Sequence, residues 1–326
     1  MKRLYRLTAA STLLALSGWG AQTNATQTAA VPTNATPEYI MFVLPVDSRL
    51  QKAKPPAQSL ARFLDYKKNG AEGKFVDNPD FWAKDIDFTC EAVWKTDAGP
   101  GNRGNMFGAT AITPRHVIFS QHCAPAEGIE LTFRGSDGKT VTRKLGPRRG
   151  VDGDIFVGIL DEDLPPTVKP ATLLATDTAR KFGAARGLPV ITLNQNEEAV
   201  VADTLGLFWL EGTSFETLAI KPMTEPRATF YKPVISGDSS NPRFFLAGDQ
   251  AILICLMWHG NGGSGAYLPL LTPRIKKAVK ELKPGYKVQE ATFNFKQPDD
   301  KKQAGKKKQP AKKQPAKKQP AKKAGA

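Results

Sequence analysis

The stretch Gly108-Ala-Thr-Ala-Ile-Thr-Pro-Arg-His-Val-Ile-Phe-Ser-Gln-His122-Cys123 decides the fold prediction. Apolar and β-branched residues fill two short runs on either side of Thr113-Pro114, a dipeptide typical of turns. The pattern predicts a strand, a turn and a second strand, with a histidine where the second strand ends.

Short β-type runs of the same kind recur between residues 86 and 270, separated by Gly, Pro, Asp and Asn. They are Phe88–Trp94, Met106–Ile112, His116–Ser120, Ile129–Phe133, Asp154–Leu160, Pro189–Leu193 and Ala251–Trp258. Such spacing predicts an all-β sandwich or barrel.

Two stretches favour helices. Thr272 is a suitable N-cap, Pro273 suits the first helical position, and Pro284-Gly285 ends the periodic run, so a helix is expected there, docked on the β core. A shorter helical stretch is expected over residues 57–68.

The positive charge of the chain is concentrated at its ends. The net charge is +15 over 326 residues, and eleven lysines in residues 301–326 with Lys2, Arg3 and Arg6 account for nearly all of it. Residues 21–300 are therefore almost neutral, which excludes a uniformly basic nucleic-acid-binding domain. Three cysteines exclude a disulfide-dense scaffold.

The N-terminal segments indicate export. Residues 1–20 pair a basic start with a short apolar run, which is typical of a signal peptide and too short to span a bilayer. Residues 21–37 have the composition of a disordered linker, and residues 38–85 form an extension, a pro-segment or a clamp. The mature protein is expected to be secreted, periplasmic or at the cell surface.

The C-terminal segments are a linker over 286–300 and a Lys/Pro/Ala-rich tail over 301–326, predicted to be extended and disordered. The tail either adheres to an acidic polymer such as a cell envelope or is a solvated, solubilising segment. It lacks aromatic residues, so specific nucleic-acid readout is not expected. No transmembrane segment is expected after residue 20.

Two further segments carry groups suited to catalysis. Asp152-Gly-Asp154-Ile-Phe-Val-Gly-Ile-Leu160 places an acid before an apolar strand, and Ser236-Gly237-Asp238-Ser239-Ser240-Asn241-Pro242 is a tight loop with hydroxyl groups. With Ser120-Gln121-His122-Cys123, these segments resemble, in the same order, the Ala-Ala-His-Cys, Asp-Ile-Ala-Leu and Gly-Asp-Ser-Gly-Gly-Pro motifs of chymotrypsin-like (trypsin-fold) serine proteases. The resemblance covers residues 86–285 and implies two six-stranded antiparallel β-barrels with a C-terminal helix.

The resemblance implies a Ser-His-Asp triad that cleaves peptide bonds of a protein or peptide through an acyl-enzyme. His122 would be the base, Asp154 its orienting acid and Ser239 the nucleophile, with the Gly237 and Ser239 N–H groups as the oxyanion hole. A serine hydroxyl is a weak nucleophile and needs a neighbouring base, which a neutral imidazole provides. No cofactor and no metal are expected.

Some assignments have competitors in the sequence. His116 is interpreted as structural because it lacks the flanking pattern of His122. The acids Asp152, Asp161 and Asp163 compete with Asp154, which is favoured because it directly precedes the apolar run. Ser240 competes with Ser239, and the Gly-Asp-Ser spacing favours Ser239.

The substrate pocket departs from the family pattern. Pro233 stands where trypsin-like members carry Asp, so a preference for Lys or Arg is not expected. The opposite wall is assigned to Met257, Trp258 and His259. His259 either contacts an acidic substrate side chain or lies on the surface in a Gly-rich loop.

Other departures concern the nucleophile loop, activation and the cysteines. Ser240-Asn241 replaces Gly-Gly. No Ile-Val-Gly-Gly-like start provides the new N-terminus that pairs, in many members, with the acid corresponding to Asp238. Cys90 is the one cysteine upstream of Cys123, which leaves a Cys90–Cys123 disulfide open, and Cys255 is expected as a buried thiol. The sequence thus predicts a serine endopeptidase, with a catalytically silent, tail-tethered binding protein as the alternative.

Overall fold

A computed structural model describes residues 39–66, 75–97, 105–178, 186–209, 215–259 and 264–293. The predicted signal peptide, the linker over 21–37 and the tail over 301–326 lie outside these ranges. No helix in the described ranges is long and apolar enough to cross a membrane.

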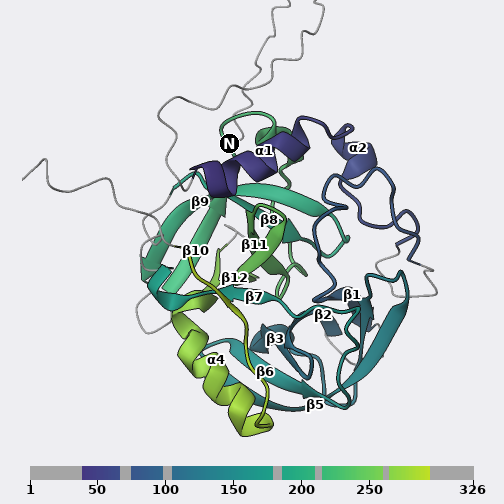
Figure 1. Cartoon of the computed structure of the whole chain (residues 1–326), viewed down its shortest axis with the longest axis vertical. Coiled ribbons are helices and arrows are strands. Elements are labelled where there is room, and N and C mark those ends of the chain that lie inside the picture. Colours follow the sequence, from purple (N-terminus) through teal and green to yellow (C-terminus); the bar gives the residue numbers. More distant parts are fainter. Residues whose placement is uncertain are drawn as a thin grey trace, which may run out of the picture. The chain divides into compact units, whose positions relative to one another are not determined.

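Six strands close into an antiparallel barrel in the order β1-β2-β3-β6-β5-β4 (Figure 1). They are β1 (Glu91–Asp97), β2 (Asn105–Thr113), β3 (His116–Ser120), β4 (Glu130–Arg134), β5 (Thr140–Asp152) and β6 (Ile155–Leu160). Ile118, Phe119, Phe133, Leu145 and Val157 of these strands are all nearly or fully buried and belong to one hydrophobic cluster. A closed antiparallel barrel confirms the β class that the recurring runs predict.

The strand bounds agree with the sequence pattern except at β1. The run from Phe88 was expected to be extended at once, but Glu91 N donates to Phe88 O at 3.0 Å, which closes a turn. The Asp87 carboxylate accepts the N–H and the hydroxyl of Thr89 at 3.0 and 2.7 Å, so it stabilises this turn. The strand therefore begins three residues later.

The other strands form a second sheet in the order β11-β8-β9-β10-β13-β12-β7-β14, with an additional pairing between β11 and β12. They are β7 (Thr172–Leu174), β8 (Pro189–Leu193), β9 (Ala199–Trp209), β10 (Phe215–Ile220), β11 (Pro242–Ala247), β12 (Gln250–His259), β13 (Ser264–Tyr267) and β14 (Glu290–Ala291). The pairs β8–β9, β9–β10 and β11–β12 are antiparallel neighbours along the chain.

The C-terminal helix α4 (Leu268–Leu282) exists, but it begins five residues earlier than predicted, with Tyr267 and not Thr272 at the N-cap. Pro269 occupies the first turn, and Pro273 lies inside the helix. A proline at 273 has no N–H for the carbonyl of Pro269, and the Thr176 hydroxyl donates to that carbonyl at 2.8 Å instead. The replaced hydrogen bond explains why the helix tolerates Pro273.

The expected helix over residues 57–68 is wrong except for one turn. The N-terminal helices are a π-helix (Tyr39–Val43), α1 (Leu44–Leu50) and α2 (Pro56–Ser59). Beyond α2 the chain is extended, because Arg62 N donates to Glu197 O and Leu64 N to Val76 O, both at 2.8 Å. Backbone hydrogen bonds to Glu197 and Val76 therefore replace the local hydrogen bonds of the expected helix.

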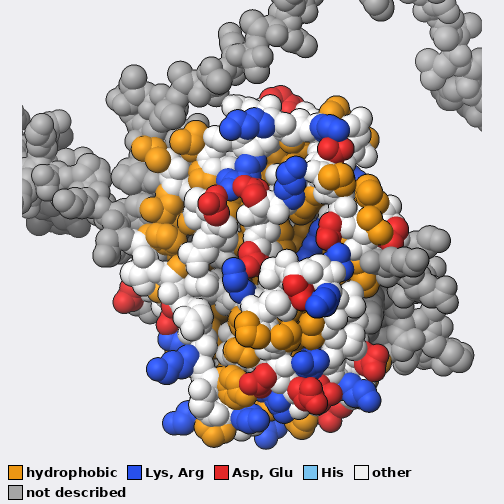
Figure 2. All heavy atoms as spheres, turned by 45° about the vertical axis from the view of Figure 1, so that its right-hand side comes forward, with side chains coloured by type: hydrophobic (Ala, Val, Ile, Leu, Met, Phe, Trp, Pro, Cys, Tyr) orange, Lys and Arg blue, Asp and Glu red, His pale blue; other side chains and the backbone are white. Residues whose placement is uncertain are grey.

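One continuous core joins the barrel to the second sheet. The rings of Phe88, before β1, and Phe244, in β11, have centroids 5.5 Å apart. Helix α4 contacts both β5 and β6 of the barrel and β7 and β12 of the sheet (Figure 1). On the face in Figure 2, basic and acidic side chains are interspersed, as the near-neutral charge of residues 21–300 suggests.

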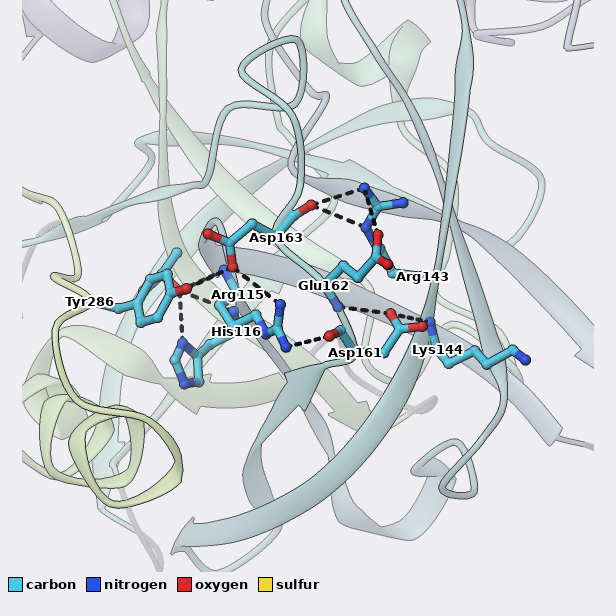
Figure 3. Close-up of polar contacts among 9 residues, drawn as sticks. Arg115, His116, Arg143, Lys144, Asp161, Glu162, Asp163 and Tyr286 are labelled. Carbon is cyan, nitrogen blue, oxygen red and sulfur yellow. Dashed lines mark hydrogen bonds and ion pairs between the residues drawn. The ribbon is translucent and has the colours of Figure 1, made fainter.

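His116 lies at the start of β3, within the polar cluster shown in Figure 3. The Thr113 Oγ1 accepts the N–H groups of Arg115 and His116 at 3.1 and 3.0 Å, so its own proton is directed to His116 Nδ1 at 2.8 Å. The imidazole is therefore neutral with its proton on Nε2, and the Tyr286 ring packs edge-on against it at 5.2 Å. These contacts agree with the interpretation of His116 as a structural histidine.

Burial, together with the positive charges of Arg115 and Lys283, lowers the pKa of His116 to about 4, although the Asp163 carboxylate opposes the shift. A lowered pKa means that the unfolded chain binds the proton more tightly. The stabilising contribution is therefore complete above about pH 6.5 and is lost as the pH falls toward 4.

We expect the free energy of unfolding to decrease on acidification from pH 6.5 to pH 4, and His116→Phe to reduce this slope. Urea unfolding at several pH values measures it. An unchanged slope in the variant would show that His116 does not contribute to the acid sensitivity.

Candidate active site

The register of β3 and β6 brings His122 next to Asp154. Ser120 pairs with Ile155, so the residues just after β3 face those just before β6. Gln121 N donates to the Asp154 carbonyl at 2.7 Å, and residues Gln121–Cys123 then form a 3₁₀ turn that carries the imidazole.

The Asp154 carboxylate holds His122 at two points. Its Oδ1 accepts the His122 backbone N–H at 2.8 Å, and its Oδ2 lies 2.5 Å from His122 Nδ1. Since an ionised carboxylate accepts, the Nδ1 carries the proton and Nε2 has its lone pair available. The imidazole is 45% exposed and the carboxyl 22%, so Nε2 can reach an incoming group. The competing acids have other partners: Asp152 pairs with Arg274, Asp161 accepts the Lys144 N–H, and Asp163 pairs with Arg115.

The loop with Ser239 is ordered by a buried carboxylate. Asp238 is 2% exposed, and its side chain accepts N–H groups from Gln195 N, Gln195 Nε2 and Ile235 N at 2.9–3.0 Å. Gly237 has a φ of +101°, which favours glycine. Gln195, which the sequence analysis does not identify, is thus the partner of Asp238.

Ser240 links this loop to the histidine turn. Its Oγ accepts the Ser120 N–H at 2.6 Å and lies 3.1 Å from Cys123 Sγ, while Ser240 N donates to Met257 O at 2.8 Å. The Ser240 side chain is completely buried, which explains why a residue other than glycine is held at a φ of +70°. A buried, hydrogen-bonded hydroxyl is a poorer nucleophile candidate than that of Ser239.

Ser239 is half-buried and directly precedes Ser240, which contacts the histidine turn. The Cα atoms of Ser239 and Ser240 are therefore about 3.8 Å apart. Within the described ranges, however, no hydrogen bond joins the Ser239 hydroxyl to His122. The described residues likewise contain no acceptor for the Ser239 N–H, a requirement for an oxyanion donor. Two members of the expected triad are therefore hydrogen-bonded, and the third lies in a loop that contacts their turn.

The Asn241 side chain fills the space that a Gly-Gly loop would leave. A Cβ at Gly108 would collide with Asn241 Oδ1, so glycine in β2 makes room for the amide. Asn241 O accepts the Met257 N–H at 3.1 Å, which ties the loop to β12. Gly108 therefore makes room for the Asn241 side chain, whose buried Oδ1 and Nδ2 have no hydrogen-bond partner among the described residues.

The expected pocket residues are only partly described. Pro233 is exposed and Met257 is buried below the loop. Trp258 and His259 end β12, where His259 pairs with Ser264, but their side chains lie outside the described part of the structure. The pocket wall thus remains an expectation for these two.

The Cys90–Cys123 disulfide is not formed: both cysteines, and Cys255, are free thiols. Cys123 Sγ contacts Ser240 Oγ instead. Burial, with the charge of Asp154, raises the pKa of Cys123 to about 11 against the lowering effect of the Ser240 hydrogen bond. The protonated thiol is not a nucleophile at neutral pH.

No protein-family model matches the chain, and no curated protein matches it significantly. Within the described residues, no group of three or more His, Cys, Asp or Glu side chains is placed to hold a metal ion.

The two histidines with defined partners should have opposite tautomers. We expect ¹⁵N spectra near pH 8 to show the proton on Nδ1 of His122 and on Nε2 of His116. In Asp154→Asn the new amide N–H₂ can donate to Nδ1, so the His122 proton should move to Nε2 while His116, the internal control, stays unchanged. A His122 tautomer insensitive to Asp154→Asn would contradict the described contact.

Proposed function

We propose that this protein is an exported serine endopeptidase that hydrolyses peptide bonds through His122, Asp154 and Ser239. The observation that carries the proposal is the two-point contact of Asp154 with the His122 Nδ1 and backbone N–H. A carboxylate in this position fixes the tautomer that a general base needs and stabilises the imidazolium formed during attack.

In the proposed reaction, Ser239 Oγ attacks the scissile carbonyl carbon as its proton passes to His122 Nε2. The carbonyl oxygen becomes an oxyanion, which the Gly237 and Ser239 N–H groups stabilise. One such donor contributes about 2.7–4 kcal/mol. Collapse breaks the C–N bond, and His122 returns the proton to the leaving amine. Water then hydrolyses the acyl-enzyme by the same route.

A second barrel is part of the proposal. The strand order β11-β8-β9-β10-β13-β12 and the additional β11–β12 pairing connect six strands in a ring, with β7 paired to β12 and β14 paired to β7. We interpret this ring as the second six-stranded barrel of a trypsin-like fold. The triad would then lie where the two barrels meet.

The location and the tail are separate proposals. Residues 1–20 would direct export to the periplasm, cell surface or medium, and the Lys-rich tail would hold the enzyme near acidic polymers. Pro233, Met257, Trp258 and His259 would line the substrate pocket.

We expect Ser239→Ala and His122→Ala each to reduce hydrolysis of a casein or peptide substrate by at least about 10⁴-fold. Because the triad acts as a unit, the double variant should be barely worse than either single variant. A fluorophosphonate should label the wild type on residue 239, as mapped by peptide mass spectrometry.

Ser236→Ala is the matched control, because it removes an exposed hydroxyl from the same loop and leaves Ser239 and the buried Ser240 in place. It should retain labelling at residue 239. Full activity of Ser239→Ala would refute the nucleophile assignment. A folded wild type with neither labelling nor hydrolysis would favour the alternative, a catalytically silent protease-like protein that binds acidic polymers through its tail.

A further inference from the structure

The loop with the oxyanion donors depends on a single side chain from another part of the fold. The Gln195 amide donates to Asp238 Oδ1 at 3.0 Å and to Ser236 O at 2.8 Å, so it bridges the two sides of Gly237. A Cβ at Gly237 would lie 2.7 Å from Gln195 Oε1. The conformation of the loop and the position of Gln195 are therefore coupled.

The charge of Asp238 makes this coupling strong. In the described ranges no Lys, Arg or His side chain pairs with the buried Asp238 carboxylate, and its three N–H donors come from Gln195 and Ile235. A buried carboxylate without a counter-ion requires such donors, because its desolvation is otherwise uncompensated. Two of the three donors belong to Gln195: its backbone N–H and its side-chain amide.

Residues 60–66 of the N-terminal extension hold the turn that carries Gln195. Arg62 N donates to Glu197 O at 2.8 Å, and Ala199 N donates to Leu60 O at 3.0 Å, so this segment pairs with the turn on both sides. The Tyr66 hydroxyl donates to the carbonyl of Gln195 itself at 3.1 Å. Burial, and then the charges of Glu197 and Glu91, raise the pKa of Tyr66, which keeps this donor protonated.

A buried charge cluster reinforces the same contact. Arg62 Nη1 lies 3.6 Å from Glu197 Oε2 and 3.4 Å from Glu91 Oε2, and all three side chains are at most 10% exposed. The guanidinium thereby joins the extension to the turn and to the first strand of the barrel. Burial and the nearby Glu197 raise the pKa of Glu91 well above its usual range, while Arg62 opposes the shift, so removing Arg62 would leave two buried acidic groups without their cation.

The extension is also part of the core. Val46, Leu50 and Leu60 belong to the cluster that fills the barrel and the second sheet. The rings of Phe42 and Phe245 in β11 have centroids 5.1 Å apart. Loss of residues 39–66 would expose this apolar surface, which does not fit a removable pro-segment.

We propose that residues 60–66, through Tyr66, Arg62 and the turn over 194–198, position Gln195 on Asp238 and so keep the Gly237–Ser239 loop in its oxyanion-binding conformation without proteolytic activation. The extension takes the place that the family resemblance assigns to a freshly cut N-terminus. The catalytic meaning of this clamp rests on the proposed function, but the clamp itself is a property of the fold. Gln195 and Tyr66 are positioning residues.

Gln195→Met tests the clamp, because it keeps the length of the side chain and removes its amide donors. We expect kcat to fall about 10²-fold and KM to change less than about threefold, since oxyanion donors act in the transition state. Tyr66→Phe deletes one hydroxyl and should lower kcat about fivefold while the protein stays folded. Gln250→Met is the matched control: the exposed Gln250 amide donates to Thr172 Oγ1 in the second sheet, and its loss should leave kcat unchanged.

Hydrogen exchange separates failure of the clamp from failure of the proposed function. The amides of Asp238, Ser240 and Asn241 donate within or next to the loop and should exchange at least tenfold faster in Gln195→Met than in the wild type. This result would support the clamp even if no hydrolysis were found. Unchanged exchange, or unchanged kcat in both clamp variants of an active enzyme, would overturn it.

Intact-mass measurement under denaturing conditions completes the test. The fluorophosphonate-labelled wild type should still contain residues 39–66 covalently joined to the barrel. Labelling that appears only after a cut between the extension and the barrel, or a labelled species that lacks residues 39–66, would overturn the proposal.

Discussion

The buried carboxylate of Asp238 is the constraint on which the candidate site depends. A desolvated negative charge must be compensated by hydrogen bonds or a counter-ion, and the described structure supplies three N–H donors. These donors come from both sides, Ile235 in the same loop and Gln195 in the turn between β8 and β9. The backbone of Gly237 and Ser239 has little freedom while they are made.

A second constraint fixes the opposite half of the site. Because β3 and β6 are antiparallel with Ser120 opposite Ile155, the first residues beyond each strand must lie together. Ser240 then joins the two halves, since its hydroxyl accepts the Ser120 N–H at 2.6 Å. The imidazole and the serine loop are therefore positioned by elements of different sheets that meet at Ser240, whose hydroxyl also lies 3.1 Å from Cys123 Sγ.

The sequence was sufficient to predict the features of the fold and site that depend on short stretches of neighbouring residues. Short apolar runs located seven of the fourteen strands in the described ranges, and the residues flanking β3 and β6 predicted the pair His122 and Asp154, which the structure brings into contact. Contacts between distant segments were not predictable: nothing in the polar turn at Asn194–Glu198 shows that Gln195 faces Asp238, and residues 60–66 carry a helical pattern although they pair with that turn. The early start of α4 depends similarly on the Thr176 hydroxyl, 93 positions before Pro269.

The departures from the family motif are explained by residues outside the motif. Side chains at Ser240 and Asn241 need space that two glycines would not need. Gly108 leaves the space that the Asn241 side chain occupies. The Ser240 hydroxyl accepts a hydrogen bond from the Ser120 N–H. The buried Asp238 carboxylate, for which the described residues provide no basic partner, accepts N–H groups of Gln195 and Ile235. In each case a loss of local freedom or charge pairing is matched by a compensating group elsewhere in the fold.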